Sequence, residues 1–234
     1  MLVLHAAPHP DDELIGAPAT LMALRDAGHE IVNVACSLGR PADAATRRAE
    51  LEDACRRAGF ELVVLEEPIA ALLERRSADL VIGPSPHDRH PAHETVGREL
   101  VAAIEAGAGP DRLWLWGLWG ALPFPTTVVE FDELRLEQIQ HALEAHESQL
   151  ARNDYRRLVA GRGMASTVLG GELVFGFGEP GLAGPYAELT TEAVRADGGW
   201  RLGAPRVLDS RDPFPEPSER EIGAWLHAPS AVDV

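Results

Sequence analysis

Short apolar runs alternate with segments of helical periodicity along the first half of the chain, and this alternation restricts the fold more than any other feature. Five runs read as strands, at residues 2–7, 30–36, 61–65, 78–83 and 112–119. Three intervals carry helical patterns that end in glycine, at 18–28, 42–59 and 94–107. Strand–helix–strand units close as right-handed crossovers. The sequence therefore predicts an α/β fold, with a Rossmann-like, mostly parallel sheet, helices on both faces and a smaller C-terminal portion.

The second half of the chain is less regular. Residues 130–163 predict one or two helices, and residues 172–178 predict a later strand. With 234 residues, 45% of them hydrophobic, the chain is long enough to bury one core. The expected organisation is a single α/β domain at 1–208, made of a core at 1–150 and an appended part at 151–208. Proline and charge at 209–234 predict an irregular tail with one short helix.

Charge and cysteine content restrict the partners and the compartment. The chain has 21 basic and 37 acidic residues, a net charge of −16, which repels phosphate backbones and anionic lipid. No apolar stretch approaches the roughly 20 residues of a membrane span, and no signal peptide is recognisable. Cys36 and Cys55 are too few for a disulfide framework. We expect a cytoplasmic protein that binds a small molecule, and arginine without any lysine favours a bacterial source. Its oligomeric state is not predictable.

Two histidine-containing motifs follow predicted strands. PHPDDE at 8–13 begins where the first strand should end, and GPSPHDRHPAH at 83–93 begins where the fourth should end. Ligands bind at this edge of such sheets. Catalytic zinc takes three protein ligands, commonly two histidines and a carboxylate. His9 and Asp12 supply two of these, a nitrogen from the second loop would complete the set, and Asp11 would remain free to accept a proton from water.

Helix capping is the alternative interpretation of the first motif. Acidic residues before an apolar run stabilise helix starts by about 1 kcal/mol. Asp11, Asp12 and Glu13 could all serve in this way. Capping does not explain His9, and it requires nothing from the second motif.

PHPDDE, followed at 90–93 by HPAH, resembles the PIG-L/LmbE-like zinc-dependent N-deacetylases, which remove acetyl groups from N-acetylglucosamine-containing substrates. HESQ at 146–149 is similar to an H-x-S-Q element of that family. The resemblance implies one Zn²⁺ per chain, with the ligands His9, Asp12 and His93. It further implies that Asp11 is the general base and that His90 stabilises the oxyanion or protonates the leaving amine.

Three further residues are candidates for the substrate site. Arg47 resembles a substrate-contacting arginine of the family, although an exposed helix arginine explains it equally well. His146 falls on the apolar stripe of the predicted 130–163 helix. It is either a core histidine bonded to backbone or a residue near the substrate carbonyl or the metal ligands. The family usually has Asp where this chain has Ala92, and Asp88 is the candidate substitute that would orient a histidine.

The function implied is hydrolysis of a linear amide C–N bond. The enzyme would release acetate and a free amine from an N-acetylglucosamine-type sugar or its conjugate. One alternative is an amidase that cleaves a larger acyl group from an amino-sugar conjugate. Another is a metal-dependent sugar-binding protein without turnover, which the retention of Asp11 disfavours because a binder needs no base.

Overall fold

The computed structural model describes residues 1–230 and confirms the α/β class. The strands are β1 Leu2–Ala7, β2 Glu30–Ala35, β3 Glu61–Val64, β4 Leu80–Pro84, β5 Arg112–Trp116, β6 Thr127–Phe131, β7 Tyr186–Ala196, β8 Gly199–Leu202 and β9 Arg206–Val207. The helices are α1 Asp12–Ile15, α2 Pro18–Asp26, α3 Ala44–Ala58, α4 Ile69–Arg76, α5 Pro91–Glu105, α6 Glu133–Leu143, α7 Glu147–Leu150, α8 Tyr155–Phe175 and α9 Gly223–Leu226. None of the helices within residues 1–230 is both long and apolar enough to cross a bilayer.

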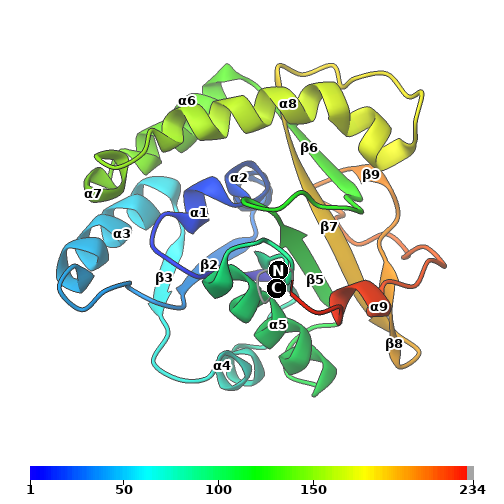
Figure 1. Ribbon diagram of the computed structural model, residues 1–234, viewed down its shortest axis with the longest axis horizontal. Coiled ribbons are helices and arrows are strands. Elements are labelled where there is room, and N and C mark those ends of the chain that lie inside the picture. The colour runs from blue at the N-terminus through cyan, green and yellow to red at the C-terminus, as the bar shows by residue number, and fades with distance from the viewer. Residues whose placement is uncertain (231–234) are drawn as a thin grey trace.

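The strands form one mixed sheet in the order β3-β2-β1-β4-β5-β7-β6-β9, with β8 paired to β7. The strands from β3 to β5 are all parallel, as expected for consecutive crossovers. The long strand β7 runs antiparallel to its neighbours. Its first half pairs with β6 and its second half with β5 and β8, so it joins the C-terminal portion to the central sheet (Figure 1). The proposed subdivision into a core and an appended part remains a prediction.

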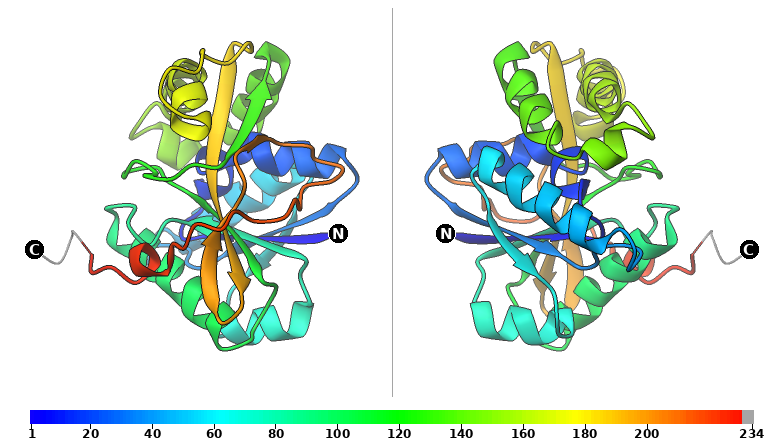
Figure 2. Two further views of the ribbon diagram at one scale, coloured as in Figure 1. Left: turned by 90° about the vertical axis from the view of Figure 1, so that its right-hand side faces the viewer. Right: turned by 90° about the vertical axis from the view of Figure 1, so that its left-hand side faces the viewer.

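Helices cover both faces of the sheet. One apolar cluster includes Leu21 of α2, Leu51 of α3 and Ile139 of α6. A second cluster on the other face includes Leu72 of α4 and Leu100 of α5. Figures 1 and 2 show α8 and α4 on opposite sides of the strands. The predicted layer arrangement is confirmed.

The second half differs from the prediction in several places. The strand expected at 172–178 is wrong, because residues up to Phe175 continue α8 and the chain turns at Gly176, with φ 120°. The predicted helical region 130–163 begins inside β6 and contains α6, α7 and the first part of α8, three helices where one or two were expected. The short helix expected in the tail is α9, and residues 231–234 of that predicted tail lie outside the described residues.

Candidate metal and catalytic site

The two histidine motifs meet at the carboxyl edge of the sheet. Because β1 and β4 are parallel neighbours, the loops that follow them start side by side. The first loop carries His9, and the second carries His90 and His93 at the beginning of α5. One ring nitrogen from each of these three histidines lies within 4.8 Å of the other two. The structure therefore brings together residues that are more than eighty positions apart in the sequence.

Asp12 lies among the same histidines. Its Oδ2 is 3.2 Å from Nδ1 of His9 and 3.4 Å from Nε2 of His93. Burial raises the pKa of Asp12, but hydrogen bonds from His9 and the charges of His93 and His9 outweigh it, so the pKa is lowered. Four candidate donors thus converge, and either Asp12 or His90 could complete a three-ligand set with His9 and His93. The ligand set His9, Asp12 and His93 remains a prediction.

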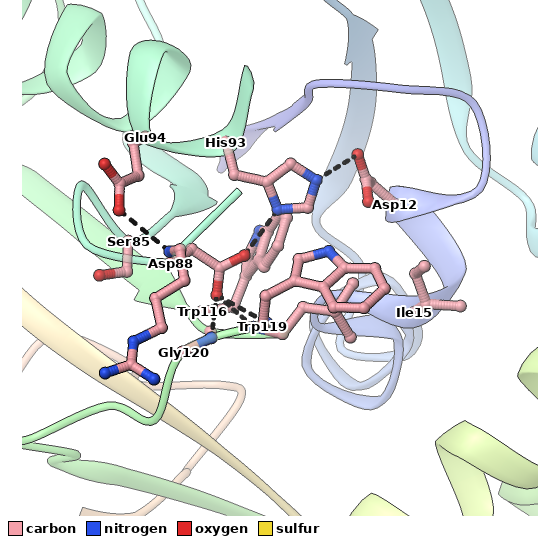
Figure 3. A network of polar contacts seen from close by, with 12 residues as sticks. Asp12, Ile15, Ser85, Asp88, His93, Glu94, Trp116, Trp119 and Gly120 are labelled. Atoms are coloured by element: carbon pink, nitrogen blue, oxygen red, sulfur yellow. Dashed lines mark hydrogen bonds and ion pairs between the residues drawn. The ribbon is translucent and has the colours of Figure 1, made fainter. Parts of the chain in front are cut away.

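Asp88 contacts Nδ1 of His93, the ring nitrogen that does not face Asp12 (Figure 3). Its Oδ2 is 2.7 Å from Nδ1 of His93, and its Oδ1 accepts hydrogen bonds from the backbone N–H groups of Leu118, Trp119 and Gly120 at 2.5, 3.0 and 3.2 Å. A carboxylate that accepts the Nδ1 proton leaves the lone pair of Nε2 free for a metal. Asp88 is buried. Among the described residues that line the cavity beside His9, Asp11 and His93, Asp88 is not included. Its position suits a carboxylate that orients His93, and not a group that touches substrate.

Asp11 has an uncommon backbone conformation. Its φ is 110°, in the left-handed region, which for a residue other than glycine costs about 1–3 kcal/mol and is concentrated at functional sites. The side chain makes no capping hydrogen bond to the described helix α1, so the structure does not support the capping interpretation of Asp11. Burial raises the pKa of Asp11 well above its usual range, and the carboxylates of Asp12 and Glu13 raise it further.

Glu13 and His146 form a buried pair beneath Asp11. Oε2 of Glu13 accepts the backbone N–H of Asp11 at 3.0 Å, and Oε1 lies 2.6 Å from Nε2 of His146. Both side chains have no exposed area. The expectation that His146 faces inward is confirmed, but the helix breaks before it, and it partners a carboxylate instead of backbone. It does not line the catalytic cavity in the described chain, and Glu13 connects it to the backbone of Asp11.

A cavity of about 310 Å³, which we call the catalytic cavity, is lined by the four candidate metal donors and by Asp11. Arg47 lines it, and its guanidinium donates to the carbonyl oxygen of Pro10 at 2.9 Å, which favours the site interpretation of this arginine over that of a free surface residue. Gln149, Arg152 and Asn153 line the cavity too, although the sequence did not single them out. Gln149 belongs to the HESQ element, which was the available signal for that segment.

Comparison with known proteins supports the family assignment. The PIG-L family, described as GlcNAc-PI de-N-acetylase, matches residues 4–68. The predicted family resemblance is confirmed. The matched segment contains His9, Asp11, Asp12 and Arg47, whereas the second histidine motif lies beyond it. Comparison with curated proteins gave no match.

Several solved structures share the fold. The N,N'-diacetylchitobiose deacetylase from Pyrococcus horikoshii is 21% identical, with a TM-score of 0.59, over 82% of this chain and 83% of that one. A deacetylase of the teicoplanin biosynthetic pathway is 17% identical, with a TM-score of 0.65, over 84% and 99% of the two chains. The 4-carboxy-2-hydroxymuconate hydratase GalB from Pseudomonas putida is 17% identical, with a TM-score of 0.60, over 82% and 95%. Because one of these is a hydratase, the fold alone does not define the reaction.

Proposed function

We propose that the protein is a zinc-dependent hydrolase that removes the N-acyl group, in the simplest case acetyl, from a glucosamine-type amino sugar or its conjugate. The observation that carries this proposal is the placement of the buried Asp11 carboxylate directly beside the His9, Asp12 and His93 donors, in one cavity at the sheet edge. The family match and the two deacetylase neighbours support the reaction class. The unpaired cysteines Cys36 and Cys55 fit the expected cytoplasmic location.

The donor set fits a zinc ion. Imidazole nitrogens together with a carboxylate oxygen are ligands that zinc prefers. His93 is already oriented for this, because Asp88 engages Nδ1 and leaves Nε2 facing Asp12. His9, Asp12 and His93 would hold one ion per chain, and His90 lies close enough to contribute. Bound there, zinc supplies Lewis acidity that acidifies water and polarises an amide carbonyl.

Side chains of the protein supply the proton transfer, the stabilisation of the oxyanion and the binding of the sugar. Asp11, with its raised pKa, accepts a proton from the attacking water and later returns it to the departing amine. Burial lowers the pKa of His90, and the neighbouring His93 and His9 lower it further, so its ring is neutral near pH 7. A neutral imidazole N–H can donate to the developing oxyanion. Arg47 and Arg152 offer hydrogen bonds to sugar oxygens at the cavity wall.

The test is acetate release from a panel of N-acetyl amino sugars and their conjugates, with zinc present. In the Asp11→Asn variant, zinc content and KM should stay near wild type while kcat falls by roughly 10²–10⁴, the usual range for general-base catalysis. Asp132→Asn is the matched control, because Asp132 caps α6 through a hydrogen bond from the Arg135 N–H. This control should keep full activity.

Each competing function gives a different result. Full turnover in Asp11→Asn would remove Asp11 from the mechanism, and loss of zinc would mean that Asp11 is a ligand. A sugar-binding protein would bind the panel without releasing acetate. A protein with the chemistry of the hydratase neighbour would neither bind the panel nor release acetate.

A further inference from the structure

A second cavity, of about 440 Å³, adjoins the catalytic one. It is enclosed by α8, the first half of β7 and the segment 117–125 that follows β5. Ile15, Leu118 and Trp119 line both cavities. Trp119 is 54% exposed and stacks on the ring of His90, with centroids 6.2 Å apart. The second cavity therefore lies directly beside the candidate metal donors, and the two cavities share part of their walls.

The wall of this second cavity is mainly hydrocarbon. Phe131, Val159 and Leu189 contribute to it. Its two charged residues are engaged by the protein itself. The guanidinium of Arg162 donates to backbone carbonyl oxygens of Ile15 and Gly117, and the carboxylate of Glu188 accepts from N–H groups and a hydroxyl at the start of α2. The free surface therefore suits an apolar group.

The catalytic cavity is different, because part of its wall is polar. Arg47 of α3, together with Gln149, Arg152 and Asn153 at and after α7, presents donors and acceptors suited to sugar hydroxyls. α3 and α7 lie together at one side of the molecule in Figure 1. An amide substrate has two ends, a polar amino sugar and an acyl group. Matching polarity places the sugar against these residues and the acyl group toward the apolar cavity.

We infer that the second cavity binds the hydrocarbon chain of an N-acyl group longer than acetyl, so that the preferred substrates are amino sugars carrying a medium-length acyl chain. This inference rests on the proposed function. In the reaction the hydroxyl of water adds to the acyl carbon, and the remaining proton of water passes through Asp11 to the amide nitrogen as the C–N bond breaks. The products are a fatty acid, ionised at neutral pH, and the free amine. The volume falls within the range of about 300–1,000 Å³ typical of small-ligand pockets.

The experiment measures amine release from N-acetyl-, N-butanoyl-, N-hexanoyl- and N-octanoyl-glucosamine by the zinc-loaded enzyme. Burying a methylene favours binding about fourfold, so kcat/KM should rise by up to that factor per carbon until the cavity is filled. Calorimetric titration of Asp11→Asn with the N-acetyl and N-octanoyl sugars gives the corresponding affinities without turnover. The octanoyl sugar should bind more tightly.

Two neighbouring positions on α8 provide a matched pair of variants. Ser166 lines the cavity, whereas Ala165 is exposed and lies outside its wall. Ser166→Phe should fill the cavity and reduce the ratio of octanoyl to acetyl kcat/KM by at least tenfold. Ala165→Phe, which adds the same ring outside the cavity, should leave that ratio and the rate with the acetyl sugar unchanged.

The outcomes separate this inference from the proposed function. Hydrolysis of the acetyl sugar with no gain from longer chains would overturn the inference and leave the proposed function intact. Turnover of no sugar, together with tighter octanoyl binding that Ser166→Phe abolishes, would overturn the proposed function alone. The inference would also be overturned if kcat/KM did not change with acyl-chain length and sedimentation showed a dimer that both α8 variants disrupt. The surface around the second cavity would then be a contact between two copies of the chain.

Discussion

Replacing Asp88 tests whether this carboxylate orients His93 for metal binding. The carboxylate is 1% exposed and accepts four hydrogen bonds, one from His93 and three from backbone N–H groups of the segment 118–120. Asp88→Ala would leave all four donors without this partner. An unpaired buried donor costs about 1–3 kcal/mol, but of the three loop residues Leu118 and Gly120 are only partly buried and Trp119 is exposed. We therefore expect Asp88→Ala to lower the free energy of unfolding by about 3–4 kcal/mol.

Asp88→Asn separates stability from metal binding. The asparagine carbonyl oxygen can still accept from the loop N–H groups, so the stability loss should be only about 1–2 kcal/mol. Its NH₂ group, however, would face Nδ1 of His93 and donate to it. The proton of His93 would then move to Nε2, the nitrogen that faces Asp12. Zinc affinity should fall by about 10–100-fold, the usual effect of losing a group that orients a metal ligand.

The assays are urea unfolding of the metal-free protein and competition for zinc with a chromogenic chelator. Glu192→Gln is the matched control, because Glu192 is another fully buried carboxylate, paired with Arg112 and Arg206, and it lies outside the catalytic cavity in the described residues. It should reduce stability without changing zinc affinity. Wild-type zinc affinity in Asp88→Asn would refute the tautomer argument. If Glu192→Gln lost as much zinc affinity as Asp88→Asn, the effect would be one of general destabilisation.

Three further results are expected. If the predicted ligand set is correct, elemental analysis should find little zinc in purified Asp12→Ala and about one ion per chain in His90→Ala. Zinc in Asp12→Ala and none in His90→Ala would indicate a three-histidine site instead. Removing zinc with a chelator should lower the Tm, and adding zinc back should restore it, because an ion that binds only the folded state adds to stability; an unchanged Tm would argue against a resident ion. Gly97→Ala should lower the free energy of unfolding by about 1–3 kcal/mol, because its Cβ would lie 2.6 Å from the carbonyl oxygen of Pro84. Gly161→Ala, which adds a Cβ into open space within α8, should instead raise stability by about 0.5–1 kcal/mol, and equal effects of the two changes in urea unfolding would contradict this steric argument.

Most strands of the first half were predictable because β1, β2, β4 and β5 are buried between two helical layers. Such strands read as continuous apolar runs. β7 has no such signature, since it buries Glu188 and Glu192 by pairing them with groups from distant segments. Local pattern cannot show those partners, so the strand that joins the two parts of the sheet was missed. The run at 172–175 failed for the opposite reason, because its three consecutive apolar residues, 173–175, are compatible with either a strand or the last turn of a helix.

The convergence of the candidate metal donors was predictable because two rules apply to them. The motif gives the residue types, and the sheet-edge rule places both loops at one site. The pair Glu13–His146 obeys neither rule, since its partners are 133 positions apart and meet only through tertiary packing. One signal was available in the sequence. A histidine expected to face the core needs a buried partner, and Glu13 in PHPDDE was an acidic residue to which no definite role had been given.

Under the proposed function and the inference drawn from the second cavity, the reaction and its acyl selectivity depend on different parts of this chain. The family match ends at residue 68, and within it lie the proposed base and two of the proposed ligands. The apolar cavity is built almost entirely from later residues, in the segment 117–125, α8 and β7. Substitutions in α8 and β7 can change the size and polarity of this cavity without touching the candidate metal donors. Among the described residues the two cavities share Ile15, Leu118 and Trp119, none of which lies in α8 or β7. In this proposal the motif at residues 8–13 supplies the groups that would cleave the amide, whereas the choice of acyl group would depend on side chains that the motif does not include.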